Sequence, residues 1–113
     1  VIRRWKLKTV NTDLRKLPDG PFDMIWAFDT LEHVRLEDRE AGYREINRVM
    51  APHGVILLNI PRDESNHNEE FDFGQDDADV MNLSRITGTR VQKWEPYYIE
   101  EIDRSYLWVE LVR

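Results

Sequence analysis

The hydrophobic residues of this chain fall into short runs separated by polar and turn-forming segments. Two runs, Phe22–Phe28 (FDMIWAF) and residues 55–60 (VILLNI), are almost continuously apolar. Runs of this length without strict alternation are typical of strands that are covered on both faces of a sheet. The pattern therefore predicts two buried strands lying side by side.

The segment between these runs, residues 35–50, has the pattern of an amphipathic helix. Leu36, Tyr43 and Ile46 recur at helical spacing and would form its apolar face. The solvent side would carry charged pairs spaced for salt bridges, Glu40–Arg44 and Glu45–Arg48.

Turn-forming residues delimit the elements around this helix. Pro52 and Gly54 are expected to end it, because proline cannot extend the hydrogen-bond ladder and glycine tolerates a left-handed turn. Residues 5–10 alternate imperfectly and predict a further strand. Residues 11–21, rich in proline and glycine, predict a loop.

The C-terminal part predicts one short helix and two strands. The helix covers residues 76–86, and Gly88 terminates it. The strands are Arg90–Ile99 and residues 106–112. Their connection, residues 100–105, is so short that the two strands must be antiparallel.

The order of these elements indicates an α/β fold. Strand, helix and strand in succession are typical of a parallel sheet, whose loops at the carboxyl edge hold ligands. With 113 residues, the chain is large enough for one modest core. We expect a single partial domain over residues 1–113.

The net charge of −6 comes mainly from one acidic loop, residues 62–79. Eight of the 22 acids lie in residues 63–79, which contain no Lys or Arg, so the rest of the chain has 16 basic and 14 acidic residues. A chain without a basic face is not expected to bind nucleic acid. The loop and its His67 offer metal ligands, but no calcium-loop spacing is present, so no metal site is expected.

The chain has no cysteine, which excludes disulfides, thiolate chemistry and cysteine-bound zinc. This composition fits a reducing compartment, and we expect a cytoplasmic protein. No apolar run approaches the roughly 20 residues needed to span a bilayer, and no secretory signal is visible. Membrane association is therefore not expected.

Residues 13–23 (DLRKLPDGPFD) resemble the segment between the third and fourth strands of class I S-adenosylmethionine-dependent methyltransferases. The resemblance implies that the Asp13 carboxylate accepts a hydrogen bond from the adenine amino group. It also implies that the Leu14 backbone N–H donates to a ring nitrogen. From the residue alone, a turn-forming aspartate that bonds its own backbone is the favoured interpretation of Asp13.

Residues 29–34 (DTLEHV) are similar to the Leu-Glu-His-Val signature of small-molecule methyltransferases of the ubiquinone and menaquinone biosynthesis type. By this resemblance Phe28, Asp29 and Thr30 line the methionine part of the cofactor S-adenosylmethionine, and the following residues face the acceptor.

His33 is the candidate catalytic residue of this segment. It precedes the predicted helix, whose positive end disfavours imidazolium, so His33 could be a neutral base. Alternatively, Glu32 and His33 cap the helix, whose first N–H groups need partners. Methyl transfer depends mainly on alignment, so a base is not obligatory.

Residues 47–55 (NRVMAPHGV) resemble the Arg-Val-Leu-Lys-Pro-Gly-Gly turn of the same family, with His53 in place of the first glycine. This motif indicates the fold and not the chemistry. The glycine-rich loop that binds the donor is absent, because the sequence contains no Gly-x-Gly. The resemblance therefore implies the C-terminal portion of a Rossmann-like methyltransferase fold, lacking the first two strands.

Three functions fit these observations. The first is part of a methyltransferase for a small-molecule acceptor, with weak or no donor binding in isolation. The second is a non-enzymatic module that self-associates or binds a partner chain, because the strand over residues 5–10 would expose an unpaired edge. The third is a fold that binds another adenosine ligand through Asp13, although no phosphate-binding loop is present.

Overall fold

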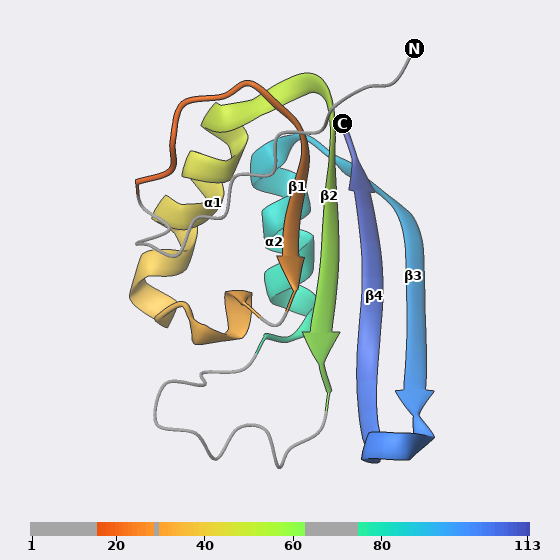
Figure 1. The fold of residues 1–113 in the computed structure, drawn as a ribbon. Helices are drawn as coiled ribbons and strands as arrows, with labels where there is room; N and C mark the ends of the chain where they lie inside the picture. Colours follow the sequence, from red (N-terminus) through yellow and green to blue (C-terminus); the bar gives the residue numbers. More distant parts are fainter. Residues whose placement is uncertain (1–15, 29, 63–74) are drawn as a thin grey trace.

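The structure, a computed structural model, describes residues 16–28, 30–62 and 75–113. These residues form a four-stranded sheet with strand order β1-β2-β4-β3 (Figure 1). β1 (Phe22–Phe28) is parallel to β2 (Met50–Pro61), and β4 (Arg104–Val112) is antiparallel to both β2 and β3 (Arg90–Ile99). The predicted α/β fold, with a parallel pair and a C-terminal antiparallel pair, is confirmed. The strand predicted over residues 5–10 lies outside the described residues.

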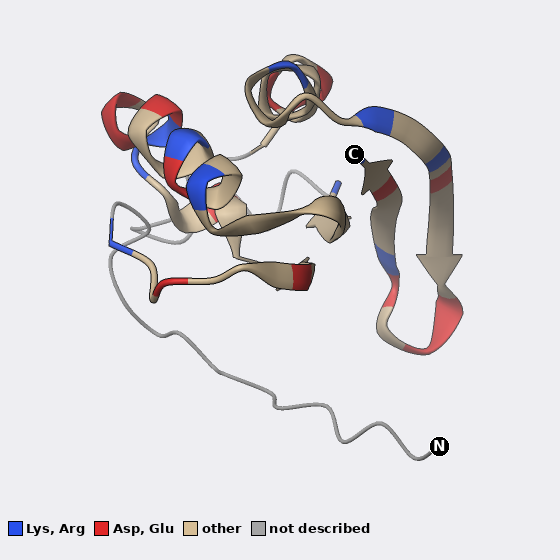
Figure 2. Cartoon of the chain, turned by 90° about the horizontal axis from the view of Figure 1, so that it is seen from above, with Lys and Arg blue, Asp and Glu red and all other residues tan. Residues whose placement is uncertain are grey.

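Two helices, α1 (Arg39–Val49) and α2 (Asp77–Thr87), pack on the same face of the sheet. Figures 1 and 2 show both helices on one side of the strands. α1 connects β1 to β2, as a parallel pair requires. The core between the helices and the sheet is apolar and includes Tyr43, Ile46, Ile56, Leu58, Val80, Leu83, Leu107 and Val109.

The predicted helix over residues 35–50 begins later than expected. Two 3₁₀ turns, η1 (Leu31–His33) and η2 (Leu36–Asp38), precede α1. The backbone between them is extended at Val34 and Arg35, with ψ values of 128° and 144°, and this interrupts the helix. Leu36 is 64% exposed, so the prediction that it belongs to the apolar face was wrong.

The helix ends within one residue of the predicted position, but the residues expected to end it were wrong. α1 ends at Val49, and β2 begins directly at Met50, so Pro52 and Gly54 lie inside the strand. Gly54 is not left-handed; a Cβ there would lie 2.7 Å from the Met50 Cγ and 3.0 Å from the Ala51 backbone oxygen. Glycine is needed here because the chain approaches itself closely.

The short helix predicted over residues 76–86 is confirmed as α2. Asp76 is its N-cap: its Oδ1 accepts a hydrogen bond from the Asp79 N–H at 2.9 Å, and the Asp76 N–H donates to Asp79 Oδ2 at 3.1 Å. Gly88 ends the helix with φ of 61°, a conformation that only glycine adopts at little cost. The antiparallel pairing of the last two strands is confirmed, with the short turn η4 (Glu100–Ile102) between them.

The second face of the sheet is not covered by the described helices. Met24, Trp26 and Phe28 of β1 point to this face and are exposed. The expectation that β1 is buried on both faces is therefore wrong for the described residues, because α1 and α2 cover only one. β1 and β3 form the two edges of the sheet, and β3 carries Pro96 at its edge.

Candidate functional site

The candidate site lies at the edge of the sheet where the parallel strands end. β1 and β2 point the same way, with Trp26 opposite Leu57 and Phe28 opposite Asn59. Figure 1 shows that the η1 turn follows β1 at this edge, and that α1 and α2 both begin there. Loops at the carboxyl edge of a parallel sheet form the ligand crevice of α/β folds.

The η1 turn is fixed by backbone hydrogen bonds and one buried side chain. The His33 N–H donates to the Thr30 oxygen and the Val34 N–H to the Leu31 oxygen, both at 3.1 Å. The Thr30 hydroxyl donates to the Phe28 backbone oxygen at 2.7 Å. Leu31 is buried in the core, so it anchors the turn from below.

Glu32 and His33 are neighbours on this turn, but the Glu32 side chain is buried and the His33 side chain is half-exposed. The Glu32 side chain is 3% exposed and the His33 side chain is 42% exposed, with His33 Nε2 at 3.4 Å from Glu32 Oε1. A buried carboxylate oxygen beside an imidazole can orient the ring. The arrangement can therefore present a half-exposed histidine that accepts a proton.

The structure brings three of the predicted site residues to this edge, namely Phe28, Thr30 and His33. Asp13, Leu14 and Asp29 lie outside the described residues. α1 begins six residues after His33. The alternative that Glu32 and His33 cap this helix was therefore wrong, and so was the expectation that its positive end acts on His33. The extended backbone after η1 separates the turn from the helix.

Sequence reasoning missed Arg39, which is 4% exposed and lies at the start of α1. Its Nη1 donates to Asp79 Oδ2 at 2.7 Å, and its Nε donates to the Val34 backbone oxygen at 3.1 Å. The available signal was its position: Arg39 precedes Tyr43 by four residues, so it falls on the apolar face of the helix.

Two further buried polar groups lie near this cluster. Neither the Tyr43 hydroxyl nor the Gln75 Nε2 has a hydrogen-bond partner among the described residues. Burial raises the pKa of Tyr43, and the nearby Asp79 carboxylate raises it further, so the hydroxyl stays protonated. The Asp79 backbone N–H holds the pKa of Asp76 below its usual value.

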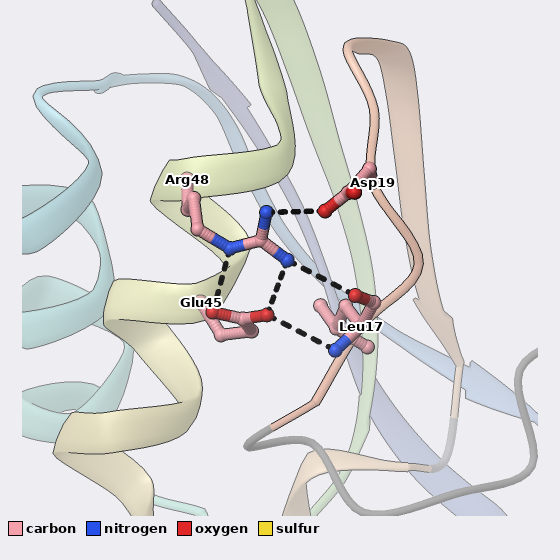
Figure 3. A network of polar contacts seen from close by, with 4 residues as sticks. All are labelled: Leu17, Asp19, Glu45 and Arg48. Carbon is pink, nitrogen blue, oxygen red and sulfur yellow. Dashed lines mark hydrogen bonds and ion pairs between the residues drawn. The ribbon is translucent and has the colours of Figure 1, made fainter.

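A second polar network attaches the segment before β1 to α1 (Figure 3). The Leu17 N–H donates to Glu45 Oε1 at 3.1 Å, and Arg48 Nη2 donates to the Leu17 oxygen at 3.0 Å. Arg48 Nη1 also contacts Asp19 Oδ1 at 2.6 Å. The predicted Glu45–Arg48 pair is confirmed, and it holds the residues that follow the Asp13 segment.

Within the described residues, no group of three or more His, Cys, Asp or Glu side chains is arranged to hold a metal ion. The acidic segment with His67 lies outside these residues, apart from its last part in α2. Across the same described ranges, no helix is both long and apolar enough to cross a bilayer.

Comparison with known proteins gives a family and several structural neighbours. A family model described as a methyltransferase domain matches residues 2–58. No curated protein sequence matches the chain significantly.

Three solved structures illustrate the structural similarity. The N-methyltransferase NodS from Bradyrhizobium japonicum WM9 superposes with a TM-score of 0.74 at 13% identity, covering 92% of this chain and 58% of that one. A methyltransferase from Methanosarcina mazei gives a TM-score of 0.69 at 12% identity, covering 90% and 65%. Magnesium protoporphyrin IX methyltransferase (ChlM) from Synechocystis PCC 6803, crystallised with S-adenosylmethionine, gives 0.64 at 18% identity, covering 92% and 44%. The chain thus spans between 44% and 65% of the length of these neighbours.

Proposed function

Because the chain belongs to the methyltransferase domain family, we propose that it is the carboxyl-terminal part of an S-adenosylmethionine-dependent methyltransferase for a small-molecule acceptor. The observation that carries this proposal is the parallel pairing of β1 with β2, with the His33 turn at its carboxyl edge. The neighbours that were crystallised with S-adenosylmethionine or S-adenosylhomocysteine support the choice of donor. The sequence of the turn favours an enzyme of the quinone-biosynthesis type.

In this proposal the donor is bound by two short segments. Asp13 and Leu14 would bind the adenine edge, because a carboxylate acceptor beside an N–H donor matches its hydrogen-bonding pattern. Phe28, Asp29 and Thr30 would line the methionine part, since Phe28 ends β1 at the carboxyl edge and Thr30 precedes the η1 turn.

The reaction would proceed by direct transfer at this edge. A lone pair of the acceptor attacks the methyl carbon, the methyl–sulfur bond breaks, and its electron pair stays on sulfur. His33 would accept the proton that the acceptor loses. Glu32 Oε1, 3.4 Å from His33 Nε2, favours a hydrogen on Nε2 and leaves Nδ1 as the basic nitrogen. Most of the acceleration would come from alignment of the two reactants.

We expect this chain to bind the donor weakly or not at all in isolation, because it contains no Gly-x-Gly. The test is an NMR titration of the isotope-labelled chain with S-adenosylhomocysteine. If the chain binds S-adenosylhomocysteine, we expect non-saturating amide shifts at Leu14 and at residues 28–33, and smaller shifts in an Asp13→Asn variant. ATP, which lacks the amino-acid part, is the control.

Two results would count against the proposal. Donor-induced shifts that appear at β3 and not at the η1 turn would contradict a donor site at this edge. Saturation at micromolar S-adenosylhomocysteine would contradict the expected weakness of the isolated chain.

One observation favours the second candidate function, a non-enzymatic module that self-associates or binds a partner chain. The edge strand β1 exposes Met24, Trp26 and Phe28 on one face, and exposed apolar edge strands are pairing surfaces. Light scattering tests this candidate, and a monomeric mass at high protein concentration would argue against it.

A further inference from the structure

We propose that Arg39 is a positioning residue that fixes the His33 turn to the beginning of α2; this inference rests on the proposed role of His33. The Arg39 side chain is buried at the start of α1. Its Nε reaches the Val34 oxygen at 3.1 Å, and its Nη1 reaches Asp79 Oδ2 at 2.7 Å. One guanidinium therefore joins the segment after β1 to the first turn of a helix 40 residues away.

On the side of the turn, Arg39 holds the residue that follows His33. The Val34 carbonyl accepts from Arg39, and the Val34 N–H donates to the Leu31 oxygen at 3.1 Å. In the sequence His33 lies between Leu31 and Val34, which are joined by this bond, and its own N–H donates to the Thr30 oxygen. A displacement of Val34 would therefore move the His33 ring.

On the side of the helix, Arg39 shares a carboxylate with the N-terminal cap of α2. Asp79 Oδ2 accepts from Arg39 Nη1 at 2.7 Å and from the Asp76 N–H at 3.1 Å. The same Asp79 donates its own N–H to Asp76 Oδ1 at 2.9 Å. A shift of the start of α2 would therefore move the Arg39 guanidinium, and the guanidinium would move the turn that contains His33.

Stability alone does not account for a charged residue at this position. A buried ion pair often contributes no more than apolar residues of similar volume. What arginine adds is a planar fork that holds two acceptors in a fixed geometry. Lysine keeps the charge but presents it as a point, so it cannot hold Val34 and Asp79 in the same way. Arg39→Lys therefore removes the planar geometry of the guanidinium but keeps its positive charge.

The experiment uses NMR on the 113-residue chain with two measurements. The first is hydrogen exchange at the backbone amides of His33 and Val34, both of which are hydrogen-bonded. The second is the chemical shift of the His33 ring Cε1–Hε1 group. Arg44→Lys is the matched control, because Arg44 lies on the same helix, is exposed, and pairs with Glu40 at 2.7 Å.

In Arg39→Lys we expect exchange at His33 and Val34 to accelerate on the order of tenfold, with a shifted His33 ring signal. Amides inside α1, such as that of Ile46, should keep their rates, and Arg44→Lys should change neither measurement. Unchanged exchange with an unchanged ring signal in Arg39→Lys would overturn the inference. Equal acceleration throughout α1 would overturn it as well.

If Arg39→Lys does not fold, Asp79→Asn replaces it. This variant keeps Arg39 but removes the charge that its Nη1 faces, so a smaller acceleration is expected at His33 and Val34; none would overturn the inference. Neither measurement requires a methyl donor. Donor-induced shifts at β3 and not at the η1 turn would therefore reject the proposed function, while these two measurements would still show whether Arg39 fixes the turn.

Discussion

The two faces of the sheet differ sharply, although the same strands build both. On the face covered by α1 and α2, Ile56 and Leu58 are 0% exposed. On the opposite face, Trp26 of the neighbouring strand is 53% exposed. Tilted and stacked aromatic rings continue across that open face from Trp26 to Phe28 and Trp108, with centroids 5.8 and 5.5 Å apart.

An apolar strand sequence predicts that both faces of the strand are covered, but among the described residues the helices cover only one face. Stability of the described fold should depend on the covered face, because burial and packing are complete there. The open face should contribute to association, because its aromatic rings still contact water. Substitutions on each face test this division.

The largest effect is expected for Leu58→Ala on the covered face. Truncating a fully buried leucine costs about 2–5 kcal/mol of unfolding free energy, a large part of the total for a small domain. Leu57→Ala is the matched control on the open face, where we expect a loss of about 1 kcal/mol. Urea denaturation measures both, and equal losses would remove the distinction between the faces.

A smaller effect is expected for Arg113→Met at the end of β4. The Arg113 Nε donates to the Thr87 oxygen at 3.1 Å, and Nη1 donates to the Met50 oxygen at 3.1 Å. These bonds connect the end of β4 to the end of α2 and to the start of β2. Their loss should lower the free energy of unfolding by about 1–2 kcal/mol. Arg104→Met, at the exposed opposite end of β4, should change the denaturation midpoint much less.

On the open face, Trp26→Ser should change association more than stability. We expect a loss of less than about 1 kcal/mol and a lower average mass by light scattering, because the largest exposed ring is removed. Leu36→Ser is the control, since Leu36 is an exposed apolar residue outside the sheet. An unchanged mass in Trp26→Ser, or an equal decrease in Leu36→Ser, would contradict a role of this face in association.

The smallest effect is expected for Glu45→Gln in the network that attaches Leu17 to α1. The Arg48 guanidinium lowers the pKa of the Glu45 carboxyl. Because the pKa is lower in the folded state, the stabilisation is present above the usual carboxyl range and is lost as the pH falls through it. As the pH is lowered from 7 to well below the usual carboxyl pKa, the Tm of the parent should fall slightly more than that of the variant. Glu101→Gln, on the η4 turn, should leave this difference unchanged.

Local signals explain which elements the sequence could predict. The limits of β1 were predicted because Pro21 and the end of the apolar run bound it. α2 was predicted because Gly88 marks its C-terminal end. The start of α1 was missed because the residues directly before it, Leu36–Asp38, form the 3₁₀ turn η2 in place of a first α-helical turn.

The candidate site depended more on distant contacts. The position of His33 at the carboxyl edge followed from the strand order and the resemblance. The contact of Arg39 with Asp79 joins residues 40 positions apart, and no local pattern indicates such a pairing. The exposure of Trp26 was also missed, because an apolar run shows that a strand avoids water but not which segments cover it.

Pro96 in β3 has a consequence for how far the sheet can be extended. β3 forms the edge opposite β1, and it carries Lys93, Glu95 and a proline that has no amide hydrogen to donate. Any copy that joins through β1 therefore meets a terminated sheet on the far side. For the described sheet we therefore expect strand pairing to stop at two copies related by a twofold axis and not to continue into a filament.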